Sequence, residues 1–182
     1  MHTFFENYFA QYHTVLDSFL KNATHRKALS EAINLLKEAK SKKHTVFLIG
    51  NGGSMAMAEH MSVDLTKNAG LRAMAFSGAP LLTAVSNDYS FSEVFQRAIN
   101  SYAQTGDILI AISSSGASIN ILKGCYAARE NRMKIITFSG FKDDNPLRQL
   151  GDINFWINSK AYGFVETIHS LLLHFINDAL IN

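Results

Sequence analysis

Hydrophobic residues recur at steps of three and four over the first forty positions of the chain. One such segment covers residues 3–20 and a second covers residues 25–39. This spacing places apolar side chains on one face of a helix, so it predicts two amphipathic helices. The first is rich in aromatic residues, and we expect its apolar face to pack on something larger than its neighbour, such as another subunit. Its apolar positions are Phe4, Tyr8, Phe9, Tyr12, Val15, Leu16 and Phe19.

After about residue 40 the pattern changes to short apolar runs that end in glycine, serine or asparagine. Each run has the length of a buried strand, and segments with helical spacing separate the runs. This alternation predicts an α/β domain with a mostly parallel sheet covered by helices on both faces. The expected strands are residues 45–49, 71–76, 107–112, 134–138 and 152–157, and the expected helices are residues 54–67, 80–86, 92–102, 118–131 and 164–180.

Composition favours a single domain over residues 1–182, with two helices in 1–40 and the α/β core in 41–182. The chain is 47% hydrophobic and 18% charged, as is ordinary for a globular protein. Its formal charge of +2 gives no large field of one sign, so nucleic acid is not an expected partner. With no membrane-length apolar run, no signal-peptide pattern and one cysteine, Cys125, we expect a soluble protein of the reducing cytoplasm.

Two loops that follow expected strands have the composition of phosphate-binding turns. The first is "GNGGS", residues 50–54, where glycines let the backbone approach a ligand and Ser54 can cap the next helix. The second is "SSSGAS", residues 113–118, which offers four hydroxyls just before a helix. Amides and hydroxyls at a helix N-terminus bind phosphate without needing a net positive charge. The alternative is that each loop is only a turn with a serine cap.

Two nucleotide-binding motifs are missing from the same positions. No G-x-G-x-x-G follows the strand at 45–49, so a dinucleotide site is disfavoured. No G-K-[ST] is present either, so a nucleoside triphosphate is not indicated.

Acidic and imidazole side chains are spaced for one helix face in two segments. His60 and Asp64 lie four residues apart in the helix after the first loop. The last expected helix contains "ETIHSLLLH", in which His174 interrupts an apolar face where an unpartnered imidazole would be costly to bury. Two helices could bring such groups together to hold Zn²⁺ or a similar ion, or to move protons without one. The candidates are His60, Asp64, Glu166 and His174.

The alternative for each of these residues is an ordinary surface position, or a core position with a hydrogen-bond partner. A lone histidine in a helix is more often one of these than a metal ligand.

Four stretches together resemble the phosphoheptose isomerase group of the sugar isomerase, or SIS, domain family. They are "GNGGS", "SNDYSF" at 86–91, "GDILIAISSSGAS" and "ETIHSLLLH". The resemblance covers nearly the whole chain. It implies a flavodoxin-like, three-layer α/β/α sandwich around a five-stranded parallel sheet, and a homotetramer. It also implies an aldose-ketose isomerase that converts sedoheptulose 7-phosphate to D-glycero-D-manno-heptose 7-phosphate through an enediol, for heptose and surface-polysaccharide synthesis.

The resemblance further implies a role for each matching residue. Asp64 would be the base and a ligand of a Zn²⁺ ion, His174 would ligate the same ion and shuttle a proton, and His60 and Glu166 would complete the metal site. The phosphate would lie on the second loop, at Ser113, Ser114, Ser115 and Ser118. Other substrate contacts would come from Asn51, Gly52, Gly53, Ser54, Asn87, Asp88 and Glu166.

Three positions depart from the group's pattern. The group's catalytic glutamate falls at Asp64, which is one methylene shorter, and its helix glutamine falls at Glu166, which adds a negative charge. Gly163 stands where the group usually has an aspartate. Two alternatives therefore remain open: an isomerase of another phosphorylated sugar, and a non-catalytic SIS module that binds a sugar phosphate or a protein such as a replication initiator.

Overall fold

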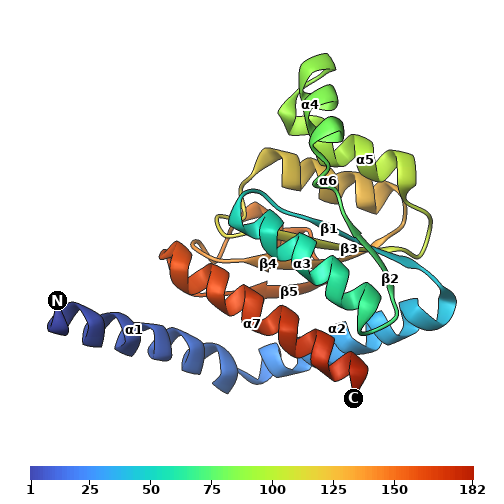
Figure 1. Ribbon diagram of the computed structural model, residues 1–182. Coiled ribbons are helices and arrows are strands. Elements are labelled where there is room, and N and C mark those ends of the chain that lie inside the picture. Colours follow the sequence, from blue (N-terminus) through green and yellow to red (C-terminus); the bar gives the residue numbers. More distant parts are fainter.

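A five-stranded, fully parallel sheet lies at the centre of the computed structural model, which describes all 182 residues (Figure 1). The strand order is β2-β1-β3-β4-β5. All five expected strands are confirmed, and none of their ends shifts by more than one residue. The strands are β1 (Thr45–Ile49), β2 (Arg72–Ala75), β3 (Ile108–Ser113), β4 (Lys134–Ser139) and β5 (Ile153–Trp156).

Helices cover both faces of this sheet, as the alternating pattern predicted. On one face lie α2 (Ala23–Lys42), α3 (Gly53–Lys67) and α7 (Tyr162–Ile181), with α1 (His2–Lys21) beside them. The other face packs on α5 (Val94–Tyr102) and α6 (Ile119–Glu130). The short η1 (Phe91–Glu93) precedes α5, and α4 (Ala79–Asp88) projects from the body in Figure 1. The short η2 (Pro146–Gln149), which the sequence pattern did not predict, begins at a proline after the Asn145 cap.

The core is divided by the sheet into two hydrophobic clusters. Side chains alternate along β1, so that Val46 and Leu48 enter one cluster and Phe47 and Ile49 enter the other. The central strand β3 is buried throughout, which explains its uninterrupted apolar run. Cys125 lies in the second cluster, and burial raises the pKa of its thiol to about 12, as befits a core residue.

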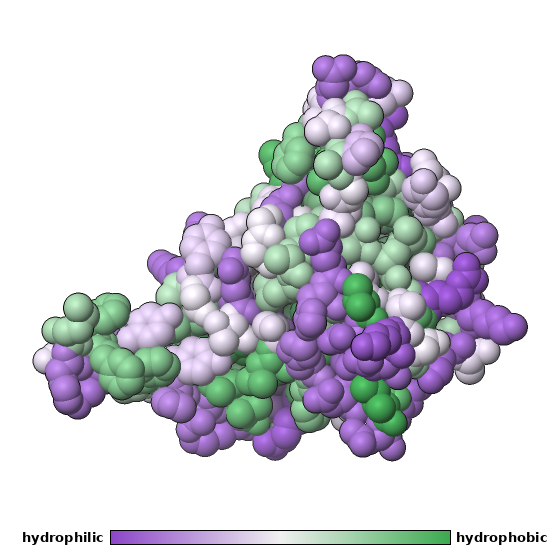
Figure 2. Space-filling model, in the orientation of Figure 1, coloured by the Kyte–Doolittle hydropathy of each residue, from purple (hydrophilic) through white to green (hydrophobic).

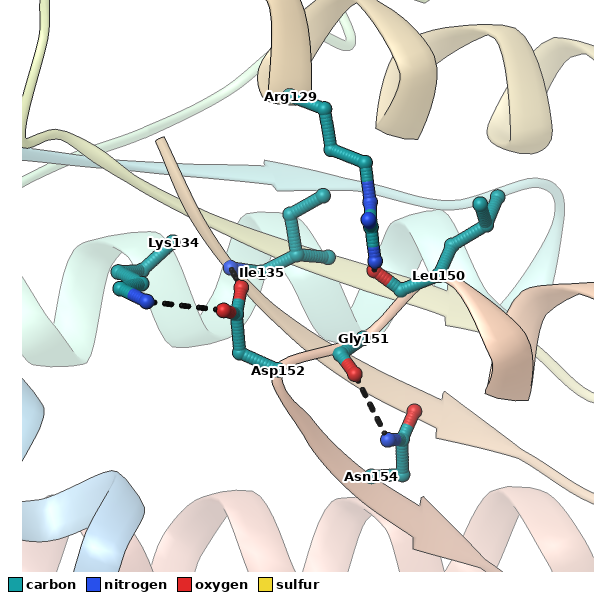
Figure 3. Close-up of polar contacts among 7 residues, drawn as sticks. All are labelled: Arg129, Lys134, Ile135, Leu150, Gly151, Asp152 and Asn154. Carbon is teal, nitrogen blue, oxygen red and sulfur yellow. Dashed lines mark hydrogen bonds and ion pairs between the residues drawn. The ribbon is translucent and has the colours of Figure 1, made fainter. Parts of the chain in front are cut away.

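Aspartates tie the amino ends of the strands together. The Asp152 carboxylate accepts hydrogen bonds from the Ile135 amide and from Lys134 Nζ, both at 2.9 Å (Figure 3). Asp107 does the same for β1, because its Oδ1 accepts the Thr45 amide at 2.7 Å. These carboxylates therefore stabilise the pairing of neighbouring strands. They lie at the amino ends of the strands, whereas the two loops singled out in the sequence lie at the carboxyl ends.

Helix α7 is long and apolar enough, by length and composition alone, to cross a membrane. In the fold it packs against α2 and α3, and eight of its residues are buried, from Phe164 to Asn177. Its hydrophobicity is therefore that of a core helix.

Helix α1 extends beyond the rest of the domain (Figure 1), and its outer end carries exposed hydrophobic surface (Figure 2). Phe4 and Phe5 are 69% and 63% exposed, and Phe9 is 45% exposed. Only the inner part of the helix packs on the domain, where Tyr8 and Tyr12 contact Phe164 of α7. Within one chain the aromatic face that the sequence revealed is therefore mostly uncovered.

Candidate active site

The two unusual loops meet where the sheet topology reverses. Strands β1 and β3 are neighbours, but the chain leaves β1 towards β2 on one side and leaves β3 towards β4 on the other. Open α/β sheets bind ligands at such a point, beyond the carboxyl ends of the strands. The β1-α3 loop and the β3-α6 loop thus begin side by side, although they are about sixty residues apart in the sequence.

A cavity of about 300 Å³ lies between these loops and the start of α7. It brings together nearly all the residues that the two loop motifs predicted, and no lysine or arginine lines it. Its lining residues are Asn51, Gly52, Gly53, Ser54, Ile112, Ser113, Ser114, Ser115, Ser118, Tyr162 and Glu166. Tyr162 was not expected from the sequence, because a tyrosine just before a helix is not a motif.

A larger hollow, of about 580 Å³, lies beside the edge strand β5, between α2 and η2. It is lined by surface groups of both charges, such as Lys27, Glu31 and Arg148, and it is remote from the strand ends at the topological switch point. The smaller cavity is therefore the better candidate for the substrate-binding site.

Close approach requires a glycine at position 50 of the first loop, whereas an added Cβ at position 53 would meet only the movable end of the Glu166 side chain. A Cβ on Gly50 would lie 2.5 Å from the Ser54 carbonyl carbon, so the tight turn into α3 excludes a side chain there. A Cβ on Gly53 would lie 2.7 Å from Glu166 Oε2. The glycine loop thus allows α3 to begin beside α7, where the Glu166 carboxylate lies next to the first turn of α3.

The serine loop offers a set of hydrogen-bonding groups that the protein leaves partly unpaired. Ser114 is 5% exposed, and its Oγ is buried with no partner in the protein. Ser113 Oγ donates to Ser118 Oγ at 3.3 Å. The first backbone hydrogen bond of α6 runs from the Leu122 amide to the Ser118 carbonyl, and the Ile121 amide donates to the Asn120 side chain, so the amides of Ile119 and Asn120 are left without a partner. Free amides and a buried unpaired hydroxyl form a cradle suited to a phosphate.

The acid and imidazole groups form a second cluster further along α3 and α7. His60 Nε2 lies 3.4 Å from Asp64 Oδ2, and His174 Nδ1 lies 3.8 Å from the same oxygen. The two imidazole rings are 5.2 Å apart at 61°. Asp64 is the most enclosed of the three, with its side chain 19% exposed. The structure thus brings together three of the four candidates that the sequence named.

These three residues fit a divalent metal ion. Their ligand atoms lie within 4.8 Å of one another. Ligands of a tetrahedral Zn²⁺ at its usual bond lengths are separated by about 3.3 Å, so small side-chain movements would bring them into range. Two histidines and one carboxylate are a donor set that catalytic zinc uses, with a further position left for substrate or water.

Glu166 lies apart from this cluster, although the sequence pattern grouped it there. It precedes His174 by eight residues, which corresponds to about 12 Å of helix rise. Its carboxylate lies in the loop cavity beside the N-terminus of α3, where the helix dipole favours a negative charge.

The cavity and the cluster lie at two ends of one helix pair. Gly53 is beside Glu166 at one end and Asp64 is beside His174 at the other, so α3 and α7 run in the same direction. Positions 53, 60 and 64 share one face of α3, because they are separated by seven and four residues. The seven residues from Gly53 to His60 correspond to about 10 Å of helix rise.

Three residues singled out in the sequence lie away from both places. Asn87 and Asp88 are exposed at the end of α4, where Asn87 Nδ2 donates to Asp88 Oδ1 at 2.9 Å, and they do not line the cavity. Because α4 projects from the body, one chain does not bring them near the loops, and their role in substrate binding stays a prediction. Gly163 faces α1, and a Cβ there would lie 2.8 Å from Tyr8 Oη.

His169, between the cavity and the cluster on α7, is fully buried. Burial lowers the pKa of its imidazole to about 4, although its hydrogen bond to the Ser139 carbonyl, at 3.0 Å, acts in the opposite sense. The carbonyl can only accept, so Nε2 carries the proton, and Nδ1 has no partner. His169 is therefore neutral at physiological pH and serves the packing of α7 on β4.

We expect this histidine to make folding sensitive to acid. The unfolded chain takes up a proton near the ordinary imidazole pKa of 6.5 and the folded chain only near 4, so stability is complete above pH 6.5 and is lost as the pH falls towards 4. Between pH 7 and pH 5 the loss amounts to about 2 kcal/mol. Urea unfolding at both pH values measures it, with His169→Gln as the comparison. Equal pH dependence in the two proteins would contradict the expectation.

Comparisons with known proteins agree on one family. The family model of the SIS domain matches residues 7–140 of the chain. The phosphoheptose isomerase of Helicobacter hepaticus is 34% identical over 177 residues, which cover 94% of this chain and 90% of that protein. The phosphoheptose isomerase of Escherichia fergusonii is 33% identical over 167 residues, covering 88% and 86%.

A solved structure gives the same result for the fold. A phosphoheptose isomerase from Neisseria gonorrhoeae superposes with a TM-score of 0.91 and 26% sequence identity, over 100% of this chain and 99% of that one. The superposition therefore includes the two leading helices as well as the five-stranded sheet.

Proposed function

The chain belongs to the SIS domain family, and from that premise we propose that it interconverts sedoheptulose 7-phosphate and D-glycero-D-manno-heptose 7-phosphate. Its curated relatives are named as phosphoheptose isomerases over nearly the full length of this chain. It is accordingly an aldose-ketose isomerase of a phosphorylated sugar, with a role in heptose and surface-polysaccharide synthesis. We place it in the cytoplasm, where such a sugar phosphate would be used.

One observation carries the choice of substrate: the phosphate cradle and the acid-imidazole cluster lie at opposite ends of the α3-α7 pair. The rise of about 10 Å along α3 between Gly53 and His60 is comparable to the length of an extended seven-carbon chain with a terminal phosphate. A substrate held by its phosphate on the serine loop would therefore present its carbonyl end to His60, Asp64 and His174.

The reaction moves one carbon-bound proton and two hydroxyl protons. In the ketose-to-aldose direction, Asp64 removes a proton from C1 while His174 donates the proton of Nε2, the ring nitrogen not turned to Asp64, to the C2 carbonyl oxygen, giving an enediol. Asp64 then returns a proton to C2, and the C1 hydroxyl gives its proton to His174 as the aldehyde forms. Both side chains finish in the protonation state in which they began.

The residues that would hold a metal ion are His60, Asp64 and His174. When bound, Zn²⁺ supplies Lewis-acid polarisation of the carbonyl and of the oxygens that become negative in the enediolate. Of the two Asp64 carboxylate oxygens, Oδ2 faces the imidazoles, while Oδ1 accepts a hydrogen bond from Asn68 at 3.3 Å. That bond fixes the carboxylate orientation in a side chain one methylene shorter than glutamate.

Glu166 would contact the substrate between the two ends, because its carboxylate enters the cavity from α7. A carboxylate accepts hydrogen bonds from sugar hydroxyls and repels a phosphate, so Glu166 favours binding with the phosphate on the serines and the hydroxyls towards α7.

The exposed aromatic end of α1 supports assembly into a homotetramer. Three phenylalanines, Phe4, Phe5 and Phe9, are each at least 45% exposed on one short stretch of helix. Surface of this kind on a soluble domain marks a contact with another chain.

Turnover of sedoheptulose 7-phosphate tests the proposed function. We expect the purified protein to form the aldoheptose phosphate, to lose about tenfold or more of its rate after treatment with a chelator, and to regain it with Zn²⁺. If the chain binds sugar phosphate but forms no aldose with or without Zn²⁺, it is a non-catalytic SIS module. Turnover of a different ketose phosphate in preference would identify an isomerase of another sugar.

A further inference from the structure

Two asparagines join the loops that form the cavity. Asn51 Nδ2 donates to Asn120 Oδ1 at 3.0 Å, and Asn120 Nδ2 donates to Asn51 Oδ1 at 2.8 Å. The two residues are 69 positions apart in the sequence. No other side-chain hydrogen bond connects the β1-α3 loop to the β3-α6 loop and the first turn of α6.

The Asn120 side chain is fixed on its own side of this pair. It is 4% exposed, and its Oδ1 also accepts the backbone amide of Ile121 at 3.0 Å. The Asn120 amide is therefore held in one orientation by the first turn of α6, with both of its polar atoms turned to Asn51. Asn51, which is half-buried in the glycine loop, has no comparable support, and its backbone carbonyl accepts the Ser54 amide at the start of α3.

We propose that Asn120 is a positioning residue for substrate binding: it holds Asn51, and with it the glycine loop, against the N-terminus of α6. Asn120 does not line the cavity and would not touch the substrate. Its effect is to hold the glycine loop firmly beside the N-terminus of α6, where the phosphate end of the substrate would bind. The inference rests on the proposed function in taking a sugar phosphate as the ligand.

The reason for the effect is pre-organisation. The glycine loop has high backbone freedom in isolation, and a ligand that had to order it would lose binding energy. An amide pair that orders the loop before the ligand arrives removes that cost. Losing the pair should therefore weaken binding at the phosphate end more than it slows chemistry at the distant Asp64.

The test compares Asn120→Ala, Asn51→Ala and the double variant with a matched control. Asn131→Ala provides the control, because Asn131 sits at the other end of α6 and forms a similar amide bond, to Asn100 Oδ1 at 2.9 Å. KM and kcat are measured with sedoheptulose 7-phosphate, and the dissociation constant is measured with inorganic phosphate. Backbone hydrogen exchange is followed at residues 50–54.

We expect Asn120→Ala to raise KM and the phosphate dissociation constant about tenfold, with kcat changed less than about threefold. In the Asn51→Ala background the same substitution should add little, because the pair is already broken. Hydrogen exchange at residues 50–54 should accelerate in Asn120→Ala and stay as in the wild type in Asn131→Ala.

The proposal would be overturned by a KM within twofold of the wild type, by additive losses in the double variant, or by unchanged exchange at residues 50–54. If Asn120→Ala does not fold, Asn51→Ala breaks the same pair from the loop side, and exchange at residues 50–54 gives the answer. If the wild type neither turns over the sugar nor binds phosphate, the proposed function fails, while the exchange measurement still decides whether Asn120 holds the loop.

Discussion

Asp64→Asn lowers kcat for the isomerisation by about a hundredfold to ten-thousandfold, the range that a general base contributes. Asparagine keeps the size of the side chain and can still accept a hydrogen bond from Asn68, so the helix is undisturbed. It cannot take a proton from C1, and it weakens the metal site by replacing a carboxylate with a neutral amide. The measurement is steady-state kinetics with sedoheptulose 7-phosphate at saturating Zn²⁺.

Glu59→Gln is the matched control for this substitution. Glu59 is an exposed acid on the same helix, next to His60, and its side chain has no partner. The change from carboxylate to amide is the same, so kcat should stay within about twofold of the wild type, as for most surface substitutions. A kcat for Asp64→Asn within threefold of the wild type would remove Asp64 from the chemistry.

Gly116→Ala destabilises the protein by about 2 to 4 kcal/mol and weakens phosphate binding with it. Gly116 has φ +63, which an L residue rarely adopts, and an added Cβ would overlap the side-chain amide of Asn145. Asn145 is 2% exposed and donates to the Lys142 carbonyl at 2.7 Å, so it has no free direction in which to move. The displaced serine loop would lose its alignment with α6.

Urea unfolding and a phosphate titration measure the two effects of this substitution. Gly78→Ala is the control, because Gly78 has φ -57 and nothing lies within 4 Å of an added Cβ. Its stability should fall by no more than about 1 kcal/mol, the cost of alanine at the N-cap of α4. If Gly116→Ala were as stable as Gly78→Ala, the packing of the serine loop on Asn145 would not be a constraint.

The fold could be predicted from the sequence because its signals are local. The apolar run of β3 and the stepped pattern of α2 each report burial within a single element. The strand order β2-β1-β3-β4-β5 could not be predicted in this way, because apolar runs of similar length do not indicate which strands pair with one another. The 3-10 turn at Pro146 was missed for a related reason: four residues are too few to show a period.

The candidate site could be predicted where reactive side chains lie on one face of a single helix. Asp64 and His60 share a helix face, and His174 stood out because it interrupts the apolar face of the last helix. Glu166 precedes His174 by about 12 Å of helix rise, and spacing alone does not show whether its side chain reaches the cluster, so its role as a metal ligand stays a prediction. Asn120 was missed because its partner lies in another loop, although a polar residue in an apolar helix segment is a signal that a partner exists.

The most direct test of the account is the isomerisation of sedoheptulose 7-phosphate in D₂O, followed by proton NMR with Zn²⁺-loaded wild-type protein and with Asp64→Asn. If Asp64 removes the C1 proton and an enediol forms, the aldoheptose phosphate made by the wild type carries deuterium at C2, and recovered ketose carries deuterium at C1. The Asp64→Asn protein should show neither on the same timescale. A wild-type protein that forms no aldose, or an Asp64→Asn protein that incorporates deuterium at the wild-type rate, would contradict the account.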